Sequence, residues 1–180
     1  MHSIHLVGRG LDRALRAGTL LCVNVAGALI LLIVGVGALD MVMSFALNKP
    51  IAAATNLSEE LLPPSVFLST GMVVRNRADI VVDVLTEWMS EPVKRVVGVL
   101  AAVLSFVFLG ILALGAVKLA VSSVAIRETA VAAGEFAVWP MKVAFAIGVC
   151  MTSFEAARIV VLSLIAPADV IPAANKNEEN

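Results

Sequence analysis

The chain has 180 residues, of which 60% are hydrophobic and 15% are charged. Its mean hydropathy of +0.98 exceeds what a soluble domain of this length needs to fill one core, so the composition indicates a membrane protein. The formal net charge of −1 provides no basic surface for a nucleic-acid backbone, which excludes nucleic acid as a partner.

The first predicted membrane span covers residues 17–47. Its segment 17–39 carries no charge and exceeds the ~20 residues that cross a hydrocarbon core of ~30 Å. A signal peptide is the alternative, because three arginines precede the run and Ala26-Gly27-Ala28 resembles a cleavage site. The apolar run continues past that site and is longer than the core of a typical signal peptide, so we expect a retained helix.

The second predicted span, residues 57–75, opens with two adjacent carboxylates, Glu59 and Glu60. The spacing of Asn56-Leu57-Ser58-Glu59 fits a capping box at the positive end of the helix dipole. Pro63 and Pro64 then remove two helical N–H groups, which leaves backbone carbonyls in the first part of the helix without partners. Inside a membrane protein, neighbouring polar groups must satisfy these carbonyls. We therefore expect the start of the helix to pack against protein, which makes Glu59 and Glu60 candidates for a subunit interface.

Residues 79–91 follow the second span and have a helical pattern of their own. Asp83 and other polar residues recur on one side, while Trp88 and several aliphatic residues share the opposite side. The pattern predicts a short helix on the cytoplasmic membrane surface with Trp88 anchored at headgroup depth; a plain connecting loop is the alternative. Asp83, with Arg75 and Arg77 just before the segment, is a further interface candidate.

The third and fourth predicted spans cover residues 93–121 and 138–166. Lys118, near the end of the third span, either pairs with Asp40 of the first span or extends to water. Trp139 is the expected interfacial anchor at the start of the fourth span. After the fourth span, residues 167–180 read as a flexible cytoplasmic tail.

Glu155 and Arg158 lie in the second half of the fourth span. They are three residues apart, so they share a helix face and an intrahelical pair is expected. Ionisable residues inside a membrane mark a functional site by default. A contact with Arg75 or Arg77, or with another subunit, would make them structural.

Catalytic chemistry has little support in the sequence. The two histidines, His2 and His5, stand at the amino end, so neither a metal or haem site nor a Ser/His/Asp group can be assembled within the membrane. Cys22 and Cys150 both lie in apolar stretches and read as packing thiols. We therefore expect no enzyme activity, no metal and no cofactor.

The expected fold is an all-α integral membrane protein, with a single four-helix domain in residues 1–166. The distribution of lysine and arginine predicts the orientation of the chain in the membrane, because cytoplasmic segments carry more of these residues than segments on the other side. Nine lie on the side of the two termini and the second loop, and four lie on the other side. Both termini are therefore expected in the cytoplasm. The nine are Arg9, Arg13, Arg16, Arg75, Arg77, Lys94, Arg95, Arg158 and Lys176, and the four are Lys49, Lys118, Arg127 and Lys142.

Several short motifs occur in a recognisable order. They are Asn48-Lys49-Pro50, Ser58-Glu59-Glu60, Gly71, Arg75-Asn76-Arg77, the segment 79–85, and the segment 129–148. In this order and within a four-span frame, residues 18–165 resemble the small membrane subunit, the DctQ-like component, of the tripartite ATP-independent periplasmic (TRAP) transporters.

The resemblance implies a non-catalytic subunit in the bacterial inner (cytoplasmic) membrane. Its expected partners are membrane lipid, a large elevator-type membrane subunit that moves organic acids with sodium ions, and a periplasmic substrate-binding protein. The small subunit is expected to brace the large one. The alternative is an independent four-helix membrane protein, either a small homo-oligomeric exporter or the membrane anchor of a redox enzyme.

Overall fold

The computed structural model describes residues 2–51, 53–76, 91–130 and 136–165. This part of the chain forms four α-helices and no strand longer than a single bridge, which joins Thr129 to Ala137. The all-helical fold is therefore confirmed for the described residues. The helices are α1 (His2–Leu47), α2 (Ala54–Arg75), α4 (Glu91–Ala125) and α5 (Trp139–Ile165).

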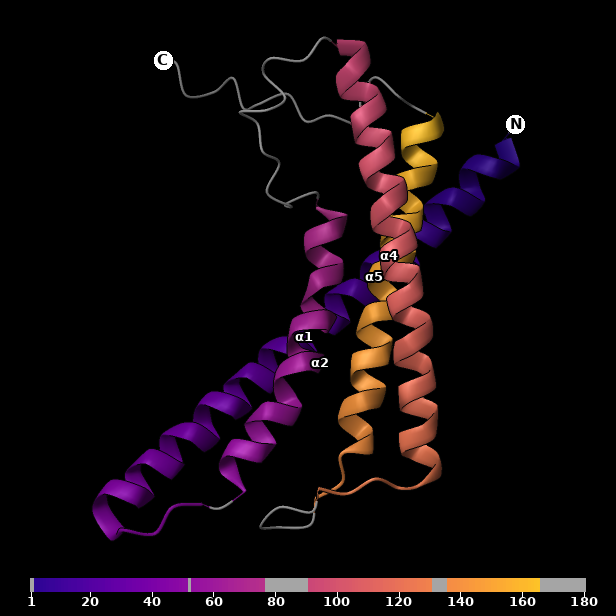
Figure 1. Cartoon of the computed structure of the whole chain (residues 1–180). Helices are drawn as coiled ribbons and strands as arrows, with labels where there is room; N and C mark the ends of the chain where they lie inside the picture. The colour runs from indigo at the N-terminus through magenta and orange to yellow at the C-terminus, as the bar shows by residue number, and fades with distance from the viewer. Residues whose placement is uncertain (1, 52, 77–90, 131–135, 166–180) are drawn as a thin grey trace, which may run out of the picture.

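The four helices pack as two pairs joined through their centre. Contacts are extensive between α1 and α2, between α2 and α5, and between α4 and α5, whereas α1 and α5 touch over a short stretch. Figure 1 shows α4 and α5 running side by side, with α1 passing obliquely across the group. The two pairs separate toward the end that holds the α1–α2 and α4–α5 connections. The polar site lies near the crossing of α1 with α2 and α5.

Within the residues that the structure describes, three segments are long and apolar enough to cross a membrane: Leu15–Leu47, Val96–Ala125 and Trp139–Val161. They correspond to the first, third and fourth predicted spans. The second predicted span is a helix, α2, but it is not among these three, so a fourth crossing stays a prediction. Large apolar side chains are exposed along α1 and α4, with Phe45 94% and Phe108 66% exposed, as expected of helices that face lipid or another subunit.

Small residues bring α2 and α5 into close contact. A Cβ atom at Gly148 of α5 would lie 2.7 Å from both the carbonyl carbon of Phe67 and the amide nitrogen of Leu68. Next to it, the fully buried Thr152 donates to the Gly148 carbonyl at 2.9 Å and lies 3.5 Å from the Phe67 carbonyl. Such small-residue contacts replace hydrophobic burial as the source of helix association within lipid.

The expected capping box at the start of α2 is wrong. The helix begins at Ala54, with Ala53 as its N-cap and no side-chain cap hydrogen bond. Backbone bonds start the helix instead, because the Ala54 N–H donates to the Ile51 carbonyl at 2.9 Å and the Leu57 N–H donates to the Ala53 carbonyl at 2.9 Å. Glu59 and Glu60 thus lie beyond the first turn, and α2 continues through both prolines.

Asp40 stabilises the α1–α2 connection. Its Oδ1 atom accepts the backbone N–H of Ile51 at 2.6 Å, and among the described ion pairs there is none between Asp40 and Lys118. Several other expectations lie outside the described residues: the surface helix except Glu91, which belongs to α4; Arg77, Asp83 and Trp88; and the tail.

Candidate functional site

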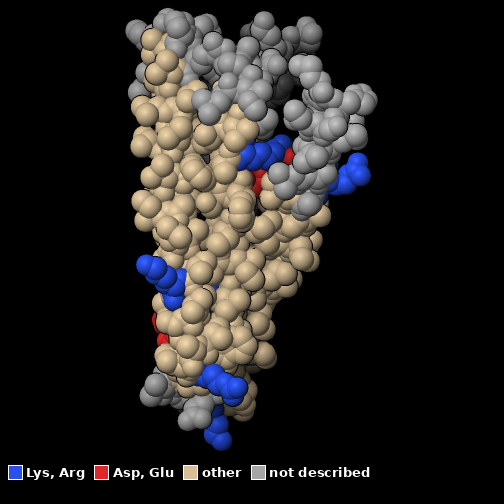
Figure 2. Space-filling view, turned by 90° about the vertical axis from the view of Figure 1, so that its right-hand side faces the viewer, with Lys and Arg blue, Asp and Glu red and all other residues tan. Residues whose placement is uncertain are grey.

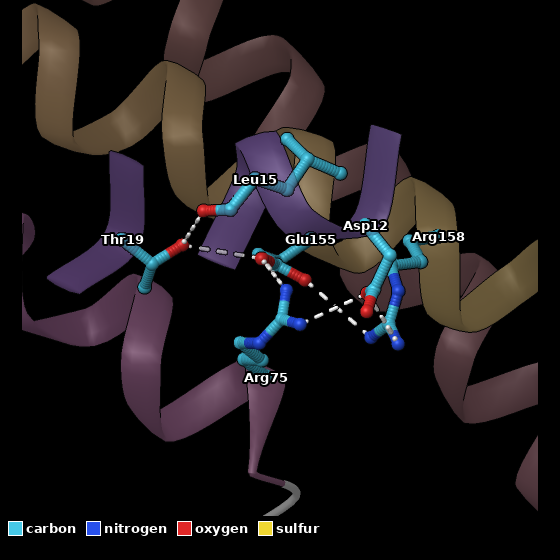
Figure 3. Close-up of polar contacts among 6 residues, drawn as sticks. All are labelled: Asp12, Leu15, Thr19, Arg75, Glu155 and Arg158. Carbon is cyan, nitrogen blue, oxygen red and sulfur yellow. Dashed lines mark hydrogen bonds and ion pairs between the residues drawn. The ribbon is translucent and has the colours of Figure 1, made fainter. Parts of the chain in front are cut away.

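Four charged side chains from three helices form a closed ring (Figure 3). Arg75, the last residue of α2, lies between two acids: its Nη1 is 2.7 Å from Glu155 Oε1, and its Nη2 is 2.9 Å from Asp12 Oδ1. Arg158 closes the ring, with Nη2 at 2.9 Å from Asp12 Oδ1 and Nη1 at 3.6 Å from Glu155 Oε2. The ring ties α1 and α2 to α5.

The ring is buried at Glu155 and Arg75 and partly exposed at Arg158 and Asp12. The side chain of Glu155 is 0% exposed and that of Arg75 is 11% exposed, against 30% for Arg158 and 43% for Asp12. Two acids and two arginines alternate, so the formal charges sum to zero. A buried carboxylate without a partner costs several kcal/mol, and Arg75 supplies the shortest contact that prevents this cost for Glu155.

Thr19 of α1 completes the surroundings of Glu155. Its hydroxyl lies 2.8 Å from the Leu15 carbonyl and 3.1 Å from Glu155 Oε1, and a hydroxyl has one proton to donate. The other carboxylate oxygen, Glu155 Oε2, is buried without a hydrogen bond. Glu155 therefore depends mainly on Arg75, which comes from a different helix.

The sequence predicted part of this ring. Glu155 and Arg158 are near neighbours on α5 as expected from their spacing, and Arg75 reaches Glu155, one of the contacts considered from the sequence. Asp12 was missed, although it is the sole acid in residues 1–39 and stands among arginines. A single acid among several arginines favours an ion pair, and this pattern could have identified Asp12 from the sequence.

The remaining candidates lie elsewhere. Glu59 is exposed and Glu60 is partly exposed on α2. Fifteen positions separate Glu60 from Arg75 in this helix, or roughly 22 Å at 1.5 Å per residue, so the ring and the two glutamates occupy opposite ends of α2. Trp139 is the first residue of α5 and is 38% exposed.

A second polar cluster joins α4 to α5 at the end opposite the ring. Lys142 Nζ lies 2.6 Å from both carboxylate oxygens of Glu128, and the buried Ser123 donates to Glu128 Oε2 at 2.6 Å. These hydrogen bonds, from Lys142 first and Ser123 second, hold the pKa of Glu128 below its ordinary value. Arg127, at a positive φ of 49°, turns the chain out of α4 and places Glu128 there.

The lowered pKa of Glu128 predicts an acid-sensitive connection. Its contribution to stability is fully present above the ordinary carboxyl pKa of 4.5 and is lost as the pH falls through the lower pKa of the folded state. Thermal unfolding of the detergent-solubilised chain, measured from neutral pH down to pH about 3, should show this loss. Glu128→Gln should be less stable than the wild type at neutral pH and should approach it at the acid end. An unchanged pH profile in the variant would contradict the assignment.

The charged groups of both clusters are paired with one another. Among the residues that the structure describes, no three His, Cys, Asp or Glu side chains come together as a metal group. In the ring, each charged group faces a partner of opposite charge from another helix or another turn. The chemistry of the arrangement is the fixing of helices to one another.

The fold and the ring together define a helical membrane protein whose main polar site holds its own helices. A family model described as "Tripartite ATP-independent periplasmic transporters, DctQ component" matches residues 33–165. The match covers well over half of the chain, so the chain belongs to this family, as its motifs predicted. No curated protein and no solved structure matches the chain.

Membership places the chain in a family of membrane transporter components rather than of enzymes, and implies a small subunit of a TRAP transporter. It also implies a large membrane subunit and a periplasmic binding protein as partners. The matched residues include Arg75, Glu155 and Arg158, whereas Asp12 precedes them. Asp12, the residue that α1 contributes to the ring, therefore lies outside the part of the chain that the family model matches.

Proposed function

We propose that this chain is the non-catalytic small subunit that braces the large, elevator-type subunit of a sodium-coupled organic-acid transporter in the bacterial inner membrane. The observation that carries the bracing role is the charge ring. It fixes α1 and α2 to α5 through Arg75, and the outer faces of α1 and α4 are apolar and exposed. A rigid body with exposed apolar faces suits a stationary support within the bilayer.

The proposed topology has four spans with both termini in the cytoplasm. It is supported by the nine-to-four distribution of lysine and arginine. In this orientation the ring lies at the cytoplasmic end, and the cluster of Glu128 and Lys142 lies at the periplasmic end. A small exporter has less support, because the carboxylate that it would need inside the membrane, Glu155, is held by Arg75 at 2.7 Å.

The direct test is a pull-down of the chain, tagged at its carboxyl end, from cells that also express its neighbouring genes. A stoichiometric large membrane protein, identified by mass, would support the proposal. A solitary chain or a homo-oligomer would contradict it and would favour the exporter.

Glu60→Ala should weaken assembly with the large subunit. Glu60 is partly exposed at the far end of α2 from the ring, so we expect the fold to survive and the yield of co-purified large subunit to fall about tenfold, equivalent to about 1.4 kcal/mol. Arg75→Ala should lower the yield as well, through the fold of the chain. Substrate uptake should fall in parallel, while the binding protein keeps its affinity for substrate.

The matched control is Lys118→Ala, which removes an exposed charge on α4. It should leave yield and uptake unchanged. If Glu60→Ala or Arg75→Ala co-purified with the large subunit at wild-type yield yet lost transport, a bracing role alone would be wrong.

A further inference from the structure

Among the side chains that the structure describes around the ring, arginines outnumber acids. The ring itself is neutral, but the turn of α1 that carries Asp12 also carries Arg13 and Arg16, both of which are exposed. Counting the ring residues and these two, four arginines face two acids, a formal excess of two positive charges. The two additional positive charges lie on the exposed surface of α1 beside Asp12, whose carboxylate contacts Arg75 of α2 and Arg158 of α5.

This basic group lies near the ends of the apolar segments of α1 and α5, which in the proposed topology is the depth of lipid headgroups. The apolar segment of α1 begins at Leu15, between Arg13 and Arg16, and the apolar segment of α5 ends at Val161, three residues beyond Arg158. Figure 2 shows the charged side chains of one face in a few separate groups, with uncharged surface between them. Basic groups between membrane helices at this depth bind anionic lipid headgroups.

Asp12 shows how an anionic oxygen fits between the arginines. One oxygen atom, Oδ1, lies 2.9 Å from a guanidinium nitrogen of Arg75 and 2.9 Å from one of Arg158. The Asp12 and Arg158 side chains are 43% and 30% exposed, so this side of the ring is open to ligands. Arg16 is four residues beyond Asp12 on the helix and therefore lies next to it on the surface of α1.

We propose that Arg13, Arg16 and the exposed part of Arg158 bind the headgroup phosphate of an anionic phospholipid beside Asp12. Charge complementarity supports a lipid, because the cations surround the start of an apolar helix surface along which acyl chains can lie. Asp12 limits the affinity, since its carboxylate repels the phosphate and occupies the nearest guanidinium groups. The site requires no partner subunit.

The test is a titration of the purified full-length chain in neutral detergent with phosphatidylglycerol, and with phosphatidylcholine for comparison. Binding is followed by native mass spectrometry and by the lipid-induced rise in unfolding temperature. Neutralising Arg13 and Arg16 together, in Arg13→Gln/Arg16→Gln, should weaken phosphatidylglycerol binding by about 25-fold, or about fivefold for each arginine. Phosphatidylcholine binding should not change.

Two further variants test whether the lipid binds specifically at this site. Lys118→Gln/Arg127→Gln removes two exposed cations toward the other end of the molecule and should change phosphatidylglycerol affinity less than about twofold, because headgroup electrostatics are short-ranged. Asp12→Asn should tighten phosphatidylglycerol binding, the opposite direction to the arginine variant. If Asp12→Asn does not fold, the two double variants alone decide the outcome.

An equal loss in both double variants would overturn the site, since it would show attraction to the net charge alone. Displacement of the lipid by inorganic phosphate at comparable concentration would overturn the lipid assignment in favour of a free-phosphate site. The experiment uses the chain without its partners, so a negative result would leave the proposed bracing function standing.

Discussion

Replacing Arg75 with methionine should destabilise the isolated chain by about 3–5 kcal/mol. The variant leaves the carboxylate of Glu155, which is 0% exposed, without the guanidinium that lies 2.7 Å from it, and the remaining cation, Arg158, is 3.6 Å away. The free energy of unfolding in detergent, measured with a chemical denaturant, tests this value. The variant should also loosen α1, because Arg75 is one of the two residues that hold Asp12.

The double variant Arg75→Met/Glu155→Met is the matched control. It removes one positive and one negative group, and the pair of Asp12 and Arg158, 2.9 Å apart, remains. Replacing both members of a buried ion pair by apolar residues is often neutral, so most of the lost stability should return. If the double variant were as unstable as Arg75→Met, the cost would come from lost packing of the arginine side chain rather than from an unpaired charge.

Gly148→Ala is the second substitution with a large expected effect. The added Cβ would lie 2.7 Å from backbone atoms of Phe67 and Leu68, and backbone in a packed helix cannot rotate away as a side chain can. Overpacking of this kind costs about 1–3 kcal/mol, and here it would force α2 and α5 apart. Thermal unfolding in the same detergent gives the loss.

Gly110→Ala on α4 is its control, since an added Cβ there meets no atom within 4 Å beyond its chain neighbours and the backbone of its own helix. Alanine is the better helix former, so this variant should be unchanged or more stable by up to about 1 kcal/mol. A similar loss in both variants would show that glycine at these positions serves helix flexibility and not the approach of α2 to α5.

The two substitutions test different ways of joining α2 to α5. At the ring, charged groups from the two helices compensate each other's burial. Around Gly148 and Thr152, the helices approach until backbone and small polar side chains touch. Each supplies a contact that lipid does not, because apolar side chains gain little by leaving one apolar surrounding for another.

The sequence alone determined the class and the local structure of this protein. Long apolar runs, charge-free in the first and third spans, predicted the helices that became the apolar segments of α1, α4 and α5, because a bilayer of ~30 Å requires about 20 apolar residues in each crossing. The proximity of Glu155 and Arg158 followed from their spacing of three on one helix face. The motifs and their order were enough to indicate the family that the family model then matched.

The tertiary structure decided which charges on different helices meet. Arg75 contacts Asp12 and Glu155 across 63 and 80 residues of chain, and these contacts depend on how α1 crosses α2 and α5. Hydropathy gives the length of a helix but not the face that it turns to its neighbour. The start of α2 was likewise mispredicted, because backbone bonds from the preceding turn began the helix before the residues that fitted a capping box. Local patterns gave the long helices and the spacing of Glu155 and Arg158 but not the start of α2, and the partners of a buried charge are set by the packing of whole helices.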